Sequence, residues 1–246
     1  MGFWRDLLHA GGTGGLNWHV HAHGSLTRWQ PTLAMIDEFL AQVTPKNKHL
    51  VLIGGSAGWM MSHAWLAQFD TIDAFDIDPM APWLFNWRHG RALRKSGVVV
   101  HHHRTDALVH LRDVLQQHPH AFVWFDNVLG QHRYRIRDEV RVERELSELK
   151  NTLRGRSWGS LHDWLSGPVE PSKTPTTLAP LKRKNITPKM IDDTLTQQLL
   201  QSVGGHTAWS DHLTQVVLPA HTPTHLMPWA FRPNYWHWLQ AGWVSA

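Results

Sequence analysis

Short apolar runs alternate with segments of helical periodicity along the first two thirds of this 246-residue chain. The apolar runs predict strands at 50–53, 71–76, 98–100, 121–125 and 157–161. The intervening segments place apolar residues at helical spacing and predict helices at 31–43, 58–68, 79–94, 108–116 and 137–153. This alternation implies a mostly parallel sheet with helices on both faces.

The last third of the chain has a different pattern. Residues 166–187 are rich in Pro, Thr and Lys and predict a long loop, and 188–203 predicts a helix that ends at Gly204. Closely spaced strands are predicted at 213–218, 224–231 and 236–244. Strands this close in sequence imply antiparallel additions at one edge of the sheet.

The stretch from Leu50 to Asp78 carries the clearest chemical signal. An apolar strand enters the turn Gly54-Gly55-Ser56-Ala57-Gly58, a helix follows, and the next strand ends in Asp76. Glycines let a backbone approach a ligand, and a helix start offers unpaired N–H groups. A carboxylate at the next strand end can accept hydrogen bonds from two ribose hydroxyls. The layout therefore predicts a nucleoside cofactor.

Composition limits the alternatives. Cysteine is absent, which excludes disulfides, Cys-ligated zinc and a thiol nucleophile. No apolar run approaches the roughly 18 residues of a membrane span, so we expect a cytoplasmic protein without a membrane partner. The net charge of +4 and the basic segments 88–95 and 182–184 permit an anionic partner without requiring one. Many of the fifteen tryptophans, such as Trp65, Trp83 and Trp124, are expected in the core, and a C-terminal group packs strands or lines a pocket.

On these residues the chain resembles the class I S-adenosylmethionine-dependent methyltransferases over about residues 48–165. The motifs are IGGSAGW (53–59), FDIDP (75–79), HHHRTDA (101–107) and VWFDNVLGQ (123–131). The resemblance implies one Rossmann-like, doubly wound α/β domain over 1–246. Its parts would be an N-terminal extension and helix (1–45), a cofactor-binding core (46–165), and a loop, helix and C-terminal strands (166–246).

The resemblance also implies site residues. S-adenosylmethionine would contact residues of all four motifs. These are Gly54, Gly55, Ser56 and Gly58 in the turn, Asp76 and Ile77 after the second strand, Asp106 near the adenine, and Asp126 after the fourth strand. Candidates for positioning the acceptor or removing its proton are Asp126, Asn127 and His132. The expected reaction is methyl transfer to a small molecule. The oligomeric state is not predicted.

One departure from the family pattern, together with the basic segments, keeps other functions open. The family has an acid two residues before the first glycine that holds the methionine amino group, and Leu52 stands there. A non-catalytic nucleoside-binding protein is therefore one alternative. An RNA or other nucleic-acid methyltransferase is another, motivated by the basic segments, although Asp126-Asn127-Val128-Leu129 replaces the Asp/Asn-Pro-Pro-Tyr motif of amino-methylating enzymes. The Gly-x-Gly-x-x-Gly pattern of nicotinamide cofactors is missing.

The remaining candidates concern histidine. His19, His21 and His23 would share one face of an extended strand, yet no carboxylate stands in a recognised ligand pattern with them, and no metal site is predicted. The pairs His162-Asp163 and Asp211-His212 join an acid to a histidine. Neighbouring side chains on a strand point apart, so neither pair is a ready-made dyad, although the second could reach a pocket from a loop.

Overall fold

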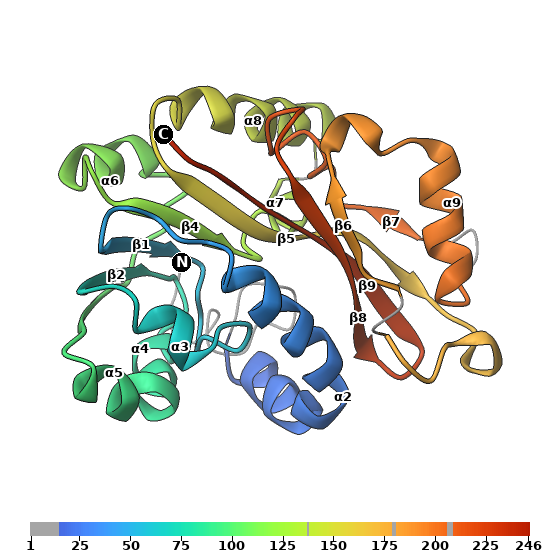
Figure 1. Cartoon of the computed structure of the whole chain (residues 1–246), viewed down its shortest axis with the longest axis horizontal. Helices are drawn as coiled ribbons and strands as arrows, with labels where there is room; N and C mark the ends of the chain where they lie inside the picture. Colours follow the sequence, from blue (N-terminus) through green and yellow to red (C-terminus); the bar gives the residue numbers. More distant parts are fainter. Residues whose placement is uncertain (1–14, 137, 179–180, 206–208) are drawn as a thin grey trace.

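The computed structural model describes residues 15–136, 138–178, 181–205 and 209–246. Its centre is a nine-stranded sheet (Figure 1). Four parallel pairings join five strands in the order β3-β2-β1-β4-β5. Their bounds are β1 His49–Ile53, β2 Thr71–Phe75, β3 Val99–His103, β4 Phe122–Asp126 and β5 Trp158–Pro168.

The strand order reverses between β1 and β4. In an open parallel sheet the crevice at the carboxyl ends of two such strands is where ligands bind. Gly54 follows β1 at this point and Asp126 is the last residue of β4. The topology therefore brings two of the predicted site residues to one edge of the sheet.

Helices cover both faces, as Figure 1 shows. One apolar core joins Leu50 and Leu52 of β1 to the lower helices of the figure, and another joins Val51 and Ile53 to the upper ones. This split follows from the alternation of side chains along a strand. The lower helices are α2 Leu16–Leu40, α3 His63–Leu66, α4 Ala81–Phe85 and α5 Arg91–Lys95, and a π-helical turn over Asn86–Gly90 joins the last two. The upper helices are α6 Leu111–Gln117 and α8 Glu139–Thr152.

The C-terminal strands extend the sheet in the antiparallel sense. The strand β9 (Tyr235–Val244) inserts between β5 and β8 (Thr224–Arg232) and runs opposite to both. The short β6 (Arg183–Ile186) pairs with β8, and β7 (Ser210–Asp211) pairs with β5. The predicted class is confirmed: a Rossmann-like, doubly wound, mostly parallel sheet with antiparallel C-terminal strands.

Several predicted boundaries are wrong. The helix expected at 31–43 begins at Leu16 and holds Pro31 inside it, so His19, His21 and His23 lie on a helix rather than a strand. The strand β5 runs on to Pro168 into the predicted loop, which also contains β6. No strand forms at 213–218, and α9 is shorter than expected at Asp193–Ser202. Trp83, expected in the core, is 66% exposed.

Among the described residues, no helix combines the length and apolar character that crossing a bilayer demands.

Candidate functional site

The glycine turn after β1 is tied to the end of β2. Gly54 and Gly58 adopt positive φ angles of 74° and 66°, and a Cβ on Gly54 would lie 2.6 Å from Val128 Cβ. The Ser56 amide donates to Asp76 Oδ2 at 2.8 Å, and the Asp78 amide donates to Asp76 Oδ1 at 2.9 Å. A carboxylate has about four lone-pair sites, so each Asp76 oxygen keeps one for a further donor. The turn and Asp76 therefore form one unit with acceptor capacity left over.

The second acid of the site, Asp126, lacks a partner. Its side chain is 6% exposed, and its Oδ1 is buried with no hydrogen-bond partner among the described residues. Burial and the neighbouring Asp76 charge raise the pKa of Asp126 to about 8. Burial, with the Asp78 charge adding to it, likewise raises the pKa of Asp76 to about 6. Two carboxyls with raised pKa values facing one cavity are suited to a cationic ligand, which would favour the ionised form of both.

Leu52, the departure from the family pattern, does not line this cavity. Its side chain is fully buried in the core on the α2 side of the sheet, where its Cδ2 lies 2.6 Å from the position of a Cβ on Gly55. Since Leu52 has no polar atom to offer, an amino group in the cavity must find another acceptor. Asp126 Oδ1 is an acceptor of that kind, since it is buried and without a partner.

The main cavity has a volume of about 460 Å³, within the range of small-molecule sites. Its lining includes the predicted residues Gly54, Gly55, Ser56, Asp76, Ile77, Asp126 and Asn127. A larger, more open cavity of about 1290 Å³ adjoins it and shares Ile77, Tyr134 and Arg135. Gly58 lines neither, since its missing Cβ faces His89 Nε2 at 2.5 Å and its role is in the turn itself.

Two predicted residues face the adjoining cavity only. Asp106 accepts from the Leu108 amide at 3.2 Å, as a helix cap would, and forms an ion pair with Arg135. His132 lies 2.8 Å from Glu145 Oε2 and does not line the main cavity. Asp76, Asp126 and Asn127 thus line the main cavity together. Asp106 and His132 line only the adjoining cavity.

A polar group on β5 and β9 was not predicted from the sequence. Asp163, fully buried, accepts from Asn127 Nδ2 and Gln131 Nε2 at 3.2 Å each, and its Oδ1 lies 2.8 Å from His237 Nδ1. Asn127 has a φ of 52° and accepts the Asp163 amide at 2.8 Å, so it clamps β4 to β5. His212 enters from the loop after β7, as the sequence allowed.

The first turns of α2 close the cavity from another side. Trp18 and His21 line it, and Trp18 Nε1 donates to Ser56 Oγ at 3.2 Å. The start of the helix is held by Asp78, which accepts the Gly15 amide at 2.8 Å and lies 2.7 Å from His19 Nε2. The first turns of α2 therefore form one wall of the cavity.

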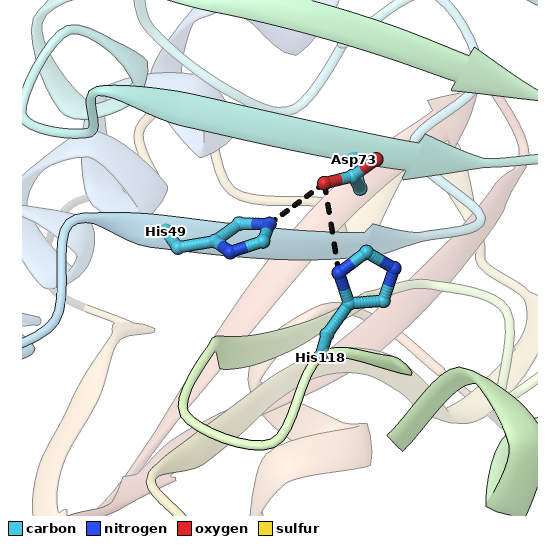
Figure 2. Close-up of side chains that lie close together, drawn as sticks. All are labelled: His49, Asp73 and His118. Carbon is cyan, nitrogen blue, oxygen red and sulfur yellow. Dashed lines mark hydrogen bonds and ion pairs between the residues drawn. The ribbon is translucent and has the colours of Figure 1, made fainter. Parts of the chain in front are cut away.

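A separate cluster surrounds Asp73 on the face of the sheet that packs on α6. Figure 2 shows His49 from β1 and His118 from the end of α6 directed at Asp73 Oδ2, at 2.7 and 3.7 Å. His103 Nε2 lies 2.6 Å from Oδ1. Burial alone would raise the pKa of Asp73, but the hydrogen bonds from His103 and His49 outweigh it and lower the pKa.

The donor atoms of His49, Asp73 and His118 lie within 4.8 Å of one another, close enough for a transition metal. A metal would have to replace the 2.7 Å hydrogen bond between His49 and Asp73. We therefore interpret the cluster as a hydrogen-bonded network that stabilises the sheet.

Some of the basic residues in the two basic segments are engaged within the protein. Lys182 and Lys184 both pair with Glu38 of α2, and the Arg88 guanidinium lies 4.3 Å from the centre of the Trp59 ring. These contacts account for three of the basic residues that motivated a nucleic-acid partner.

No protein-family model matches the chain, and no curated protein has a similar sequence. Among solved structures, magnesium protoporphyrin IX methyltransferase from Synechocystis with bound S-adenosylhomocysteine is 12% identical, covering 98% of this chain and 92% of that one (TM-score 0.45). A S-adenosylmethionine-dependent methyltransferase from Anabaena variabilis is 10% identical over 96% and 99% (0.43). The N-methyltransferase NodS from Bradyrhizobium japonicum is 12% identical over 98% and 96% (0.40). At these values the likeness does not by itself define a function.

Proposed function

We propose that this protein binds S-adenosylmethionine at the switch point of its sheet and transfers the methyl group to a small molecule. The observation that carries the proposal is the unit formed by the glycine turn, Asp76 and the unpartnered Asp126 at the carboxyl ends of β1, β2 and β4. Its position is where doubly wound sheets bind nucleosides.

Each part of the cofactor has a candidate partner. The free lone pairs of Asp76 suit the two ribose hydroxyls, and Ile77 forms an apolar wall beside them. The adjoining cavity, with Asp106 in its lining, suits the adenine. Asp126 suits the methionine ammonium, in the role that Leu52 cannot fill. When bound, the cofactor supplies an electrophilic methyl group on a sulfonium.

The residues Asp126 and Asn127 contribute by placement rather than by proton transfer. Asn127 fixes the end of β4 against β5 through Asp163, which sets the position of Asp126 at the cavity. Methyl transfer requires the nucleophile and the methyl group in line, so rigid walls around the sulfonium contribute most of the catalysis. His132, paired with Glu145, has no part in this arrangement.

Calorimetric titration with S-adenosylmethionine and S-adenosylhomocysteine tests the proposal. The wild type should bind both ligands, and Asp76→Ala should weaken each at least tenfold, because a hydrogen bond to a charged acceptor contributes about 1.5–3 kcal/mol. Asp193→Ala, an exposed acid at the start of α9, is the matched control and should bind as the wild type does. The absence of heat from both ligands with the wild type would remove the proposal.

A further inference from the structure

The cavity wall opposite the glycine turn contains an ionised acid. Asp163 is fully buried on β5 and its carboxylate receives three side-chain contacts, from His237, Asn127 and Gln131. Burial alone would raise the pKa of Asp163, but its interactions with His237 and the hydrogen bond from Asn127 outweigh it and lower the pKa. At neutral pH Asp163 is therefore an acceptor only.

That ionised acid fixes the state of His237. The 2.8 Å contact from His237 Nδ1 to Asp163 Oδ1 needs a proton, which only the ring can supply, so Nδ1 carries it. In the neutral ring Nε2 then has a free lone pair. His237 is 8% exposed and lines the cavity, and its Nε2 is buried with no hydrogen-bond partner among the described residues. A buried basic nitrogen without a partner is set to accept a proton from a ligand.

The neighbouring histidine is already satisfied. His212 Nδ1 lies 2.8 Å from the Gly130 carbonyl and must donate to it, which leaves Nε2 to accept from Ser166 Oγ at 2.9 Å. Burial lowers the pKa of His212, which keeps the ring neutral. His212 therefore fixes Ser166, and through it Tyr235 at 3.1 Å. Two cavity histidines, His237 and His21, have a buried Nε2 without a hydrogen-bond partner among the described residues. Burial lowers the pKa of His21, which makes it the weaker base, whereas His237 is oriented by an ionised acid.

The walls around His237 are aromatic. The rings of Trp229 and Phe231 have centroids 5.0 and 4.9 Å from the His237 ring, and the Tyr235 ring lies at 5.7 Å. Trp229 and Phe231 also line the cavity, as does Trp18 from α2. Such walls favour a flat, apolar acceptor over a sugar or an amino acid, because stacking and apolar burial would supply most of its binding energy.

We propose that His237, oriented by Asp163, is the general base of the reaction and that the acceptor is an aromatic molecule with an acidic O–H, of the phenol class. This inference rests on the proposed function. The acceptor oxygen forms a bond to the methyl carbon as the carbon–sulfur bond breaks, and the electron pair of that bond goes to sulfur. The acceptor proton passes to His237 Nε2. The resulting imidazolium is stabilised by the Asp163 carboxylate and then loses the proton to water.

The test combines cofactor binding with methyl transfer. A panel of phenols is incubated with methyl-labelled S-adenosylmethionine and the wild type, His237→Gln, Asp163→Asn or the control His221→Gln, which alters an exposed histidine. The wild type should methylate at least one phenol. His237→Gln should lower kcat by about 10²- to 10⁴-fold with KM changed only a few-fold, the range that general-base catalysis provides. His221→Gln should match the wild type.

Further readouts separate chemistry from folding. All variants should bind S-adenosylhomocysteine within threefold of the wild type, and added imidazole should partly restore turnover to His237→Ala. Asp163→Asn, a change in a positioning residue, should lower kcat and shift the pH profile of turnover.

Three results overturn the inference while leaving cofactor binding standing: unchanged kcat in His237→Gln, no rescue by imidazole, or a panel in which no phenol is methylated. Loss of S-adenosylhomocysteine binding by the wild type would instead contradict the proposed function itself.

Discussion

The pH dependence of cofactor binding follows from the unpartnered Asp126. With a pKa of about 8, this carboxyl is ionised in about one molecule in ten at pH 7 and about one in a hundred at pH 6. A cationic ligand that requires the carboxylate must expel that proton, and its observed affinity scales with the ionised fraction. The affinity for S-adenosylhomocysteine should therefore rise about tenfold from pH 6 to pH 7, or about 1.4 kcal/mol.

Other groups do not mimic this slope. Asp76, with a pKa of about 6, adds less than a factor of two over the same interval. An α-ammonium group stays mostly protonated below pH 7, so the ligand itself contributes little. Asp126→Asn removes the titrating group without changing its shape and should abolish most of the slope.

Isothermal titration calorimetry at pH 6 and pH 7, in two buffers of different ionisation enthalpy, measures both the affinity and the protons released. We expect about 0.9 proton released per ligand bound at pH 7 in the wild type and far less in Asp126→Asn. An affinity that is flat between pH 6 and pH 7, or an equal slope in Asp126→Asn, would refute the assignment of the ammonium to Asp126.

Three further predictions concern stability. Because the pKa values of Asp76 and Asp126 are raised, the folded protein keeps protons on them that the unfolded chain loses. The free energy of unfolding should therefore fall from about pH 4 to pH 8, and Asp126→Asn should flatten this decline in urea titrations. Asp73 has a lowered pKa, so its contribution is present above about pH 4 and lost in acid; Asp73→Asn should cost about 1–2 kcal/mol at pH 7 and little at pH 3, by thermal melts at both values. Gly130→Ala would place a Cβ 2.7 Å from Asp163 Cβ and should cost about 1–3 kcal/mol in urea unfolding. The control Gly24→Ala, at an exposed position of α2 where a Cβ meets no atom, should cost nothing; equal losses would contradict the close packing at Gly130.

The cofactor half of the site could be predicted from sequence because it is local. The glycine turn, Asp76 and the strands beside them occupy one stretch of chain, in which the apolar runs predict the strands and the glycines predict the turn. The parallel order then places Asp126 beside Gly54 without further information. General rules of α/β sheets therefore predict that residues 50–78 and the end of β4 lie at the same site.

The acceptor half could not be predicted because it depends on register. Asp163 and His237 are 74 residues apart and meet only because β9 pairs with β5 across an irregularity between Asp163 and Leu165. The available signal was a polar residue in or next to each of two apolar strands, Asp163 after the predicted strand 157–161 and His237 within 236–244. The adjacent residues His162 and Asp163 gave no indication of the contact with His237.

The helix α2 was shortened in the prediction for a different reason. Its first half contains three histidines, a glycine and a serine, and Pro31 follows in its second half; none of these residues favours a helix interior. Packing on β8 overrides these preferences: Trp29 is fully buried, Arg28 Nε donates to the Ala230 carbonyl at 3.0 Å, and Thr32 donates to the Pro228 carbonyl at 2.9 Å. Tertiary contacts of this kind leave no local pattern in the sequence.

A crystal structure of the protein with S-adenosylhomocysteine tests the central claim most directly. We predict ribose hydroxyls on Asp76, the ammonium on Asp126, and the sulfur in the cavity that His237 lines. A ligand bound elsewhere, or an Asp76 carboxylate that touches only the Ser56 and Asp78 amides in the complex, would contradict the account.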